Sequence, residues 1–153
     1  MPRSSVPPSQ VGAHSGEPAG PPRHGPRWPV RLLVVDDDPR VLTAIRETIA
    51  LEADLLIVGE AANAGSALDV AAEVRPCVAL LDVLLPDDPS GVTLIRTMSR
   101  GPVCAVVAMS VRGDLRRSAL AAGAAAFVEK SDDVELLLNS VRRAAARSHD
   151  RSG

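Results

Sequence analysis

Five short apolar segments, separated by stretches with helical spacing, organise the chain from Val30 onward. The segments that we expect to form strands are Arg31–Val35, Leu55–Gly59, Val78–Leu81, Val103–Met109 and Ala125–Val128. Their nearly continuous Val, Leu and Ala content is typical of strands covered on both faces. Alternation of such strands with helices is typical of repeated βα units. The sequence therefore predicts an α/β fold, with five helices around a doubly wound, five-stranded parallel sheet.

Capping residues indicate where several helices begin and end. Apolar residues at helical spacing follow Pro39, a residue that suits a first helical turn. Asn63 is expected to cap the second helix, and Gly123 lies where the fourth helix should end. Either Asp132 or Asp133 is expected to cap the last helix.

The ends of the chain differ in composition from its middle. Residues 1–28 contain seven prolines and four glycines with almost no apolar periodicity, which predicts a disordered leader. A passive extension is the simpler interpretation of this leader, and a docking role is the alternative. We expect one domain at residues 29–147 and a short tail at 148–153, because 153 residues with 46% apolar content suit a single core.

Charge and aromatic content argue against some classes of partner. The formal charge is −2, and the aromatic residues are only Trp28 and Phe127, so neither long-range attraction to nucleic acid nor stacking on bases is favoured. No run reaches the roughly 18 apolar residues of a membrane span. No secretory signal is evident at the start of the chain. We therefore expect a cytoplasmic protein without direct nucleic-acid or membrane binding.

Cysteine and histidine positions give no indication of a metal or catalytic site of their own. Cys77 and Cys104 lie alone in predicted strands or strand edges, which favours buried free thiols. The three histidines lie in the predicted leader and tail: His14, His24 and His149. Catalysis by a histidine base is therefore not expected.

Polar residues follow four of the five predicted strands. Strand one ends in Asp36-Asp37-Asp38, strand three in Asp82, strand four in Ser110 and strand five in Lys130, whereas strand two offers only Glu60. In a doubly wound sheet these ends meet at the ligand-binding edge. Clustered carboxylates repel one another unless a cation neutralises them, and Mg²⁺ suits oxygen ligands. The pattern predicts phosphoryl transfer with a carboxylate as nucleophile.

Four short motifs, taken in order, resemble the receiver domain of bacterial two-component response regulators. They are VVDDDP at 34–39, LLDVLLP at 80–86, MSV at 109–111 and AAGAAAFVEKS at 121–131. The resemblance spans roughly residues 30–146 and is strongest to receivers that precede LuxR-type DNA-binding domains. It implies a flavodoxin-like sheet of order 2-1-3-4-5. If the sequence is complete, output is expected through protein contacts, because no such DNA-binding domain follows residue 147.

The resemblance also implies individual roles. Asp82 matches the phosphoacceptor, and Asp36 and Asp37 match the pair that binds Mg²⁺ together with Asp82. The backbone carbonyl of Leu84 is implied as a further metal ligand.

Three later positions match groups that respond to the phosphoryl group. Ser110 and Lys130 are implied to contact it, and Ser110 and Phe127 match the switch residues of the family. Phe127 has an equally simple interpretation as ordinary core at a strand end, and the two roles are compatible.

A histidine kinase or phosphotransfer protein is the implied phosphodonor, and a downstream protein is the expected target. The sequence leaves open whether the domain forms a homodimer. Apart from its own phosphorylation and dephosphorylation, the domain is not expected to be an enzyme. One alternative is a degenerate receiver that acts as a binding module without phosphorylation. A less favoured alternative is a haloacid-dehalogenase-type phosphatase built on Asp36-x-Asp38, Ser110, Lys130 and Asp132-Asp133, which would leave Asp82 without a role.

Arginines near the fourth and fifth helices form a possible basic surface. They are Arg112, Arg116, Arg117, Arg142, Arg143 and Arg147. Either a docking patch or ordinary solvated helix faces would account for them, and the sequence favours the second without deciding between the two.

Overall fold

The computed structural model describes residues 29–86, 90–101 and 104–150, so the predicted leader at 1–28 lies outside the described residues. The strands are β1 (Val30–Val35), β2 (Leu55–Ala61), β3 (Val78–Asp82), β4 (Ala105–Ser110) and β5 (Ala126–Glu129). The helices are α1 (Pro39–Ala50), α2 (Ala64–Val74), α3 (Gly91–Ser99), α4 (Arg116–Ala122) and α5 (Val134–Asp150), and a 3₁₀ turn, η1, spans Gly113–Leu115. The strands form one sheet in the order β2-β1-β3-β4-β5, with all neighbours parallel. The predicted fold class and strand order are confirmed.

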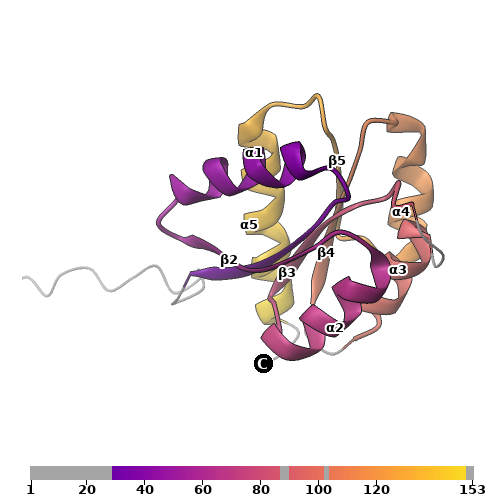
Figure 1. Ribbon diagram of the computed structural model, residues 1–153, viewed down its shortest axis with the longest axis horizontal. Coiled ribbons are helices and arrows are strands. Elements are labelled where there is room, and N and C mark those ends of the chain that lie inside the picture. Colours follow the sequence, from indigo (N-terminus) through magenta and orange to yellow (C-terminus); the bar gives the residue numbers. More distant parts are fainter. Residues whose placement is uncertain (1–28, 87–89, 102–103, 151–153) are drawn as a thin grey trace, which may run out of the picture.

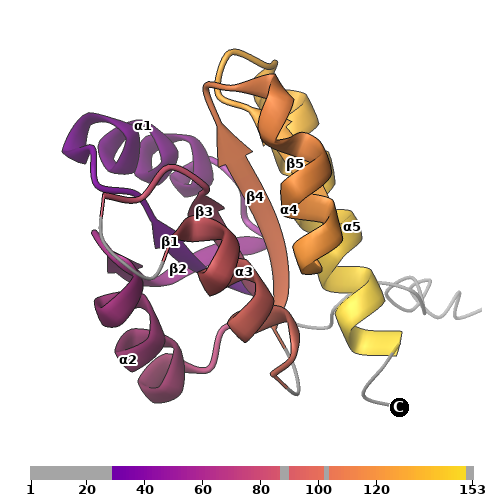
Figure 2. The ribbon, with the colours of Figure 1, turned by 90° about the vertical axis from the view of Figure 1, so that its right-hand side faces the viewer.

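Helices cover both faces of the sheet, as Figures 1 and 2 show. Apolar residues of α1 and α5 pack on one face, and those of α2, α3 and α4 pack on the other, which gives two separate cores. Both cores are aliphatic, and Phe127 is the one aromatic side chain among the buried described residues. Burial on both faces explains why the strands lack polar alternation.

Capping side chains fix several helix ends as predicted. Pro39 occupies the first turn of α1, and the Asn63 side chain accepts a hydrogen bond from Ser66 N–H at the start of α2. Gly123 ends α4 with φ of 115°, in the left-handed region that favours glycine. At α5, Asp133 rather than Asp132 receives the Glu135 N–H, at 3.2 Å.

Some predicted boundaries differ from the structure by a few residues. β2 extends to Ala61 because it pairs with β1 along its whole length, and β5 lies one residue later than expected. The described part of β4 begins at Ala105, while residue 103, the predicted start, lies outside the described residues. α5 continues through residues 148–150 of the predicted tail, so His149 belongs to its last turn, where a basic side chain suits the helix dipole.

Both cysteines are free and half-buried, immediately before β3 and β4. Burial raises the pKa of the Cys104 thiol to about 11, which keeps it protonated at neutral pH. Within the described ranges, no helix has both the length and the apolar character to cross a membrane.

Candidate functional site

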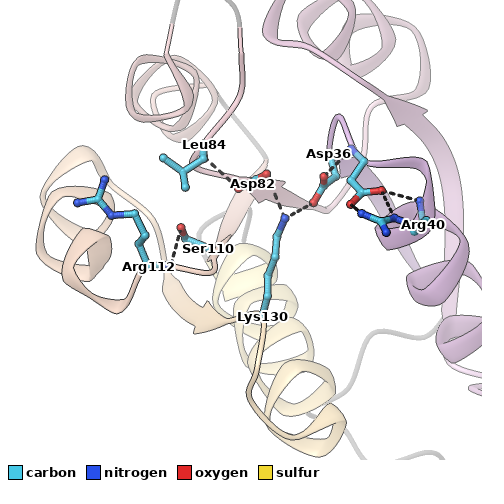
Figure 3. A network of polar contacts seen from close by, with 8 residues as sticks. Asp36, Arg40, Asp82, Leu84, Ser110, Arg112 and Lys130 are labelled. Atoms are coloured by element: carbon cyan, nitrogen blue, oxygen red, sulfur yellow. Dashed lines mark hydrogen bonds and ion pairs between the residues drawn. The ribbon is translucent and has the colours of Figure 1, made fainter.

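Four strand ends bring the predicted polar residues together at one edge of the sheet. Asp36 follows β1, Asp82 ends β3, Ser110 ends β4, and Lys130 follows β5 and reaches across to the two carboxylates (Figure 3). Asp36, Asp82 and Ser110 are buried. Glu60 of β2 does not join them, because its carboxylate binds Arg46 at 2.9 Å.

The same local turn orients the side chain at three of these strand ends. Asp36 Oδ1 accepts the N–H of Asp38 at 2.9 Å, and Asp82 Oδ1 accepts the N–H of Leu84 at 3.0 Å. Ser110 Oγ likewise accepts the N–H of Arg112 at 3.1 Å. The side chains of Asp, Asn and Ser commonly accept a hydrogen bond from the backbone N–H two residues later. In both aspartates this bond occupies Oδ1 and leaves Oδ2 facing Lys130.

Lys130 joins the two buried carboxylates. Its Nζ lies 2.7 Å from Asp36 Oδ2 and 3.1 Å from Asp82 Oδ2, with 19% of the side chain exposed. The backbone N–H of Lys130 also donates to the Ser110 carbonyl at 2.9 Å, which ties the end of β5 to the end of β4. Residues far apart in sequence are thereby held in one hydrogen-bonded group.

Lys130 is the single lysine of the chain, since all other basic residues among the 17 Lys and Arg are arginines. A compact ammonium with three donors can bond two carboxylates in different directions, whereas a planar guanidinium is suited to one fork-shaped partner. That the sequence contains a single lysine is visible without the structure, and it distinguishes Lys130 from the arginines.

Burial and pairing act in opposite directions on the charges here. Burial raises the pKa of Asp36 above its ordinary value even though the Lys130 ammonium favours the carboxylate form. Burial by itself lowers the pKa of Lys130, but hydrogen bonds to Asp36 and Asp82 outweigh it, and the pKa is raised. One ammonium cannot balance three carboxylates, so the site favours a further cation.

The donor set fits Mg²⁺. Oxygen atoms of Asp36, Asp37 and Asp82 all lie within 4.8 Å of one another. The Asp37 carboxylate is exposed and has no hydrogen-bond partner among the described residues, so it is available as a ligand. An all-oxygen set with two buried carboxylates is what a small divalent cation prefers.

The remaining predicted residues lie around this group. The Leu84 amide is oriented by Asp82, and the predicted role of the Leu84 carbonyl stays a prediction. Phe127 is 4% exposed and lies in the core beneath α4, paired in register with Ala108 of β4. Its ring therefore lies on the same face of the sheet as Ser110, two residues beyond Ala108. Asp38 lies outside the pocket, because its carboxylate caps α1 and binds Arg40.

Two arginines of the predicted basic surface form separate ion pairs with acidic residues. Arg112 binds Asp114 at 2.6 Å, and Arg142 binds Glu52 at 2.7 Å and Asp54 at 2.8 Å. These two arginines are neutralised locally, so the six arginines do not form one free docking patch.

Arg116 has a contact that sequence reasoning missed. Its guanidinium carbon lies 5.5 Å from the centroid of the Phe127 ring, and Nη2 donates to the Phe127 carbonyl at 3.5 Å. The only available signal was an arginine at the first position of a helix, where the dipole disfavours a cation.

Comparison with known proteins agrees with this geometry. The family model of the response regulator receiver domain matches residues 32–142, which is more than half of the chain. The nitrate/nitrite response regulator NarL of Escherichia coli K12 is 29% identical over 120 residues, covering 77% of this chain and 56% of NarL. A protein-glutamate methylesterase/protein-glutamine glutaminase of Myxococcus xanthus is 34% identical over 106 residues, covering 67% of this chain and 30% of that enzyme. The chain thus spans about half or less of these relatives.

Solved structures show the same fold over most of their length. The signal receiver domain of NarL from Mycobacterium tuberculosis superimposes with a TM-score of 0.71 at 26% identity, covering 77% of this chain and 97% of that domain. A LuxR-family response regulator from Aurantimonas gives a TM-score of 0.71 at 27% identity, covering 81% of this chain and 93% of that chain.

Proposed function

The chain belongs to the response regulator receiver domain family of two-component signal transduction, and on that premise we propose that Asp82 accepts a phosphoryl group from a histidine kinase or phosphotransfer protein. The observation that carries this assignment is the convergence of Asp36, Asp37, Asp82 and Lys130 at one edge of the sheet.

Each group has a role in the transfer. A carboxylate oxygen of Asp82 attacks phosphorus as the bond to the donor breaks, which forms an acyl phosphate. Asp36, Asp37, Asp82 and the Leu84 carbonyl would hold Mg²⁺, which supplies neutralisation of the phosphoryl charge. Lys130 donates hydrogen bonds to the phosphoryl oxygens in place of its present bond to Asp82.

Phosphorylation is transmitted through Ser110 and Phe127. A phosphoryl group on Asp82 attracts the Ser110 hydroxyl away from the Arg112 amide, whose hydrogen bond it now accepts. Phe127 already lies buried on the same face of the sheet, and the space that Ser110 leaves favours this inward position of its ring. Phosphorylation thereby raises the share of molecules with the inward ring, and a downstream protein distinguishes the two states at the surface of α4 and β5.

We propose that the domain acts in signalling and does not catalyse a reaction on another substrate. Methylesterases share the receiver-like segment, but this chain covers only 30% of the Myxococcus enzyme, so no methylesterase activity is proposed. We propose that the protein is cytoplasmic and that its partners are a kinase or phosphotransfer protein and a downstream protein target. A homodimer is one form that the output could take.

Neither alternative is favoured. A haloacid-dehalogenase-type site needs Asp38 beside Asp36 in the pocket, but Asp38 caps α1 and binds Arg40. A degenerate receiver would lack part of the pocket, whereas the groups expected of an active receiver are present and close.

Incubation with Mg²⁺ and acetyl phosphate tests the assignment. We expect the intact mass of the protein to rise by one phosphoryl group and Asp82→Asn to prevent the rise. Because Lys130 is the single lysine, isotopic labelling of lysine also gives one side-chain ammonium resonance, which beryllofluoride should shift.

Asp69→Asn is the matched control, since Asp69 is an exposed carboxylate of α2 and lies outside the pocket. This variant should behave as wild type. A wild-type protein that gains no mass and shows no shift of the lysine resonance would contradict the active-receiver assignment.

A further inference from the structure

The contact between Arg116 and Phe127 joins α4 to the switch aromatic. The guanidinium carbon lies 5.5 Å from the ring centroid, within the range of a cation–π interaction. The same guanidinium donates to the Phe127 carbonyl at 3.5 Å. Arg116 thus holds both the ring and the backbone of one residue.

The position of Arg116 is unfavourable for the helix that carries it. Arg116 and Arg117 are the first two residues of α4 and follow the turn η1, which contains Asp114; the N-cap of α4 makes no side-chain hydrogen bond. A cation at a helix N-terminus opposes the helix dipole. The interactions that the structure shows for the Arg116 guanidinium are its two contacts with Phe127.

The Arg116 guanidinium lies over the buried Phe127 ring. Phe127 is buried in the core beneath α4, and Figure 2 shows α4 lying over β5. Arg116 itself is exposed, whereas the ring that its guanidinium contacts is buried. An outward rotation of the ring would displace the guanidinium.

We propose that Arg116 is a positioning residue that holds the Phe127 ring in its buried place and thereby sets how readily the domain responds to a phosphoryl group on Asp82. The signalling half of this proposal rests on the proposed function. As Ser110 moves toward the phosphoryl group, the space that it leaves favours the inward ring, so the inward ring and the phosphoryl group support each other.

The single Phe of the sequence makes the ring directly observable. Protein labelled with para-fluorophenylalanine has one fluorine resonance, which reports the environment of the Phe127 ring. Arg116→Gln should move this resonance toward its position in the unfolded protein, because loss of the cation lowers the inward-to-outward ratio by roughly two- to fivefold. Arg116→Lys keeps the charge and should fall between Arg116→Gln and wild type.

Arg117→Gln is the matched control, because Arg117 is the next residue of α4, is exposed, and has no hydrogen bond or ion pair with the described residues. Its resonance should coincide with that of wild type. An unchanged resonance in Arg116→Gln would overturn the proposal. Equal shifts in the Lys and Gln variants would also overturn it, because packing alone would then account for the effect. Circular dichroism establishes that each variant is folded.

Titration with beryllofluoride and Mg²⁺ tests the signalling half. Arg116→Gln should need roughly two- to fivefold more beryllofluoride for half-saturation, because the ring and the anion are linked. Saturation at the wild-type concentration would overturn the link between Arg116 and signalling. If wild-type protein binds no beryllofluoride, the proposed function fails, while the fluorine spectra without beryllofluoride still decide whether Arg116 positions the ring.

Discussion

Lys130 binds two of the three clustered carboxylates that we propose as ligands of a divalent cation. Its ammonium lies 2.7 Å from Asp36 and 3.1 Å from Asp82. Removal of this charge leaves the carboxylates with less positive potential around them. We therefore expect Lys130→Met to bind Mg²⁺ several-fold more tightly, on the order of 1 kcal/mol, and to accept the phosphoryl group more slowly.

Isothermal titration with MgCl₂ measures the first effect, and the rate of acetyl phosphate labelling measures the second. Lys130→Arg keeps the charge and is the control for the affinity of Mg²⁺. Weaker Mg²⁺ binding by Lys130→Met would contradict the view that Lys130 competes with the metal ion.

Gly91 begins α3 directly against the segment that follows Asp82. A Cβ at this position would overlap the backbone carbonyl of Val83. We expect Gly91→Ala to lower the free energy of unfolding by about 1–3 kcal/mol and to slow phosphorylation, because the backbone beside Asp82 must shift. Urea unfolding and acetyl phosphate labelling measure the two effects.

Gly65→Ala is the matched substitution, because a Cβ there would lie 3.6 Å from Asn63 Oδ1, an ordinary contact. In α2 this change should leave the free energy of unfolding equal or raise it by up to about 1 kcal/mol. Equal effects of the two alanines would show that the close approach of Gly91 to Val83 is unimportant.

At the level of single residues, sequence pattern predicted the groups at strand ends and missed the contacts made by helix docking. Asp36, Asp82 and Lys130 were predictable because parallel strands bring their carboxyl ends to one edge. The contact of Arg116 with Phe127 was not, because it depends on how α4 lies over β5.

Among the secondary-structure elements, α5 is joined to the turn between α1 and β2 by one arginine. Arg142 binds Glu52 at 2.7 Å and, through a second pair of atoms, Asp54 at 2.8 Å. Glu52 and Asp54 lie between α1 and β2, and α1 packs in the same core as α5. The contact therefore fixes α5 against its neighbour at the end of α1.

Arg142→Gln should lower the free energy of unfolding by about 1 kcal/mol at neutral pH, since the partners are partly exposed. A hydrogen bond from Arg142 lowers the pKa of Asp54 below its ordinary value of 3.8. Stability from a lowered pKa is present above the unfolded-state pKa and is lost as pH falls through the folded-state pKa. The difference between variant and wild type should therefore shrink below about pH 3.8.

Urea unfolding across this range of pH measures the difference, and Arg143→Gln is the control. Arg143 is exposed on the same helix and has no hydrogen bond or ion pair with the described residues. A difference that persists unchanged in acid would contradict the ion-pair explanation.

Helix and strand types followed from local patterns, whereas some boundaries did not. Asn63 and Gly123 act as caps through local backbone bonds, which makes them readable from sequence. β2 exceeds its predicted length because it pairs with β1 as far as Ala61, and such pairing is not a local property.

For the whole molecule, strand alternation predicted a parallel sheet but did not determine its order. The order 2-1-3-4-5 came from resemblance, because the direction of each crossover is not written in any short segment. This order places β1 and β3 side by side, and it is their adjacency that brings Asp36 and Asp82 together.

A site assembled from separate strands exists only in the folded chain, so a cation bound there stabilises the whole domain. Mg²⁺ at about 100 times its Kd should raise the free energy of unfolding by about 2.7 kcal/mol if it does not bind the unfolded chain. Asp36→Asn should abolish most of this increase, because it removes one of the three clustered carboxylates. Urea unfolding with MgCl₂ and with EDTA measures this increase in the free energy of unfolding.

The same variant separates metal binding from intrinsic stability. The amide oxygen that Asp36→Asn introduces can still accept the Asp38 N–H that the Asp36 carboxylate accepts now. Burial raises the pKa of Asp36 above its ordinary value, so replacement by a neutral amide relieves part of the cost of burying its charge. In EDTA, we expect the free energy of unfolding of Asp36→Asn to stay within about 1 kcal/mol of the wild-type value. Loss of the bond to Lys130 offsets part of the gain from removing a buried charge. If Mg²⁺ stabilises Asp36→Asn as much as wild type, the cation binds outside the acidic cluster. If the variant loses only the stabilisation by Mg²⁺, the cation binds at the cluster beside Asp82 and stabilises the whole domain from there.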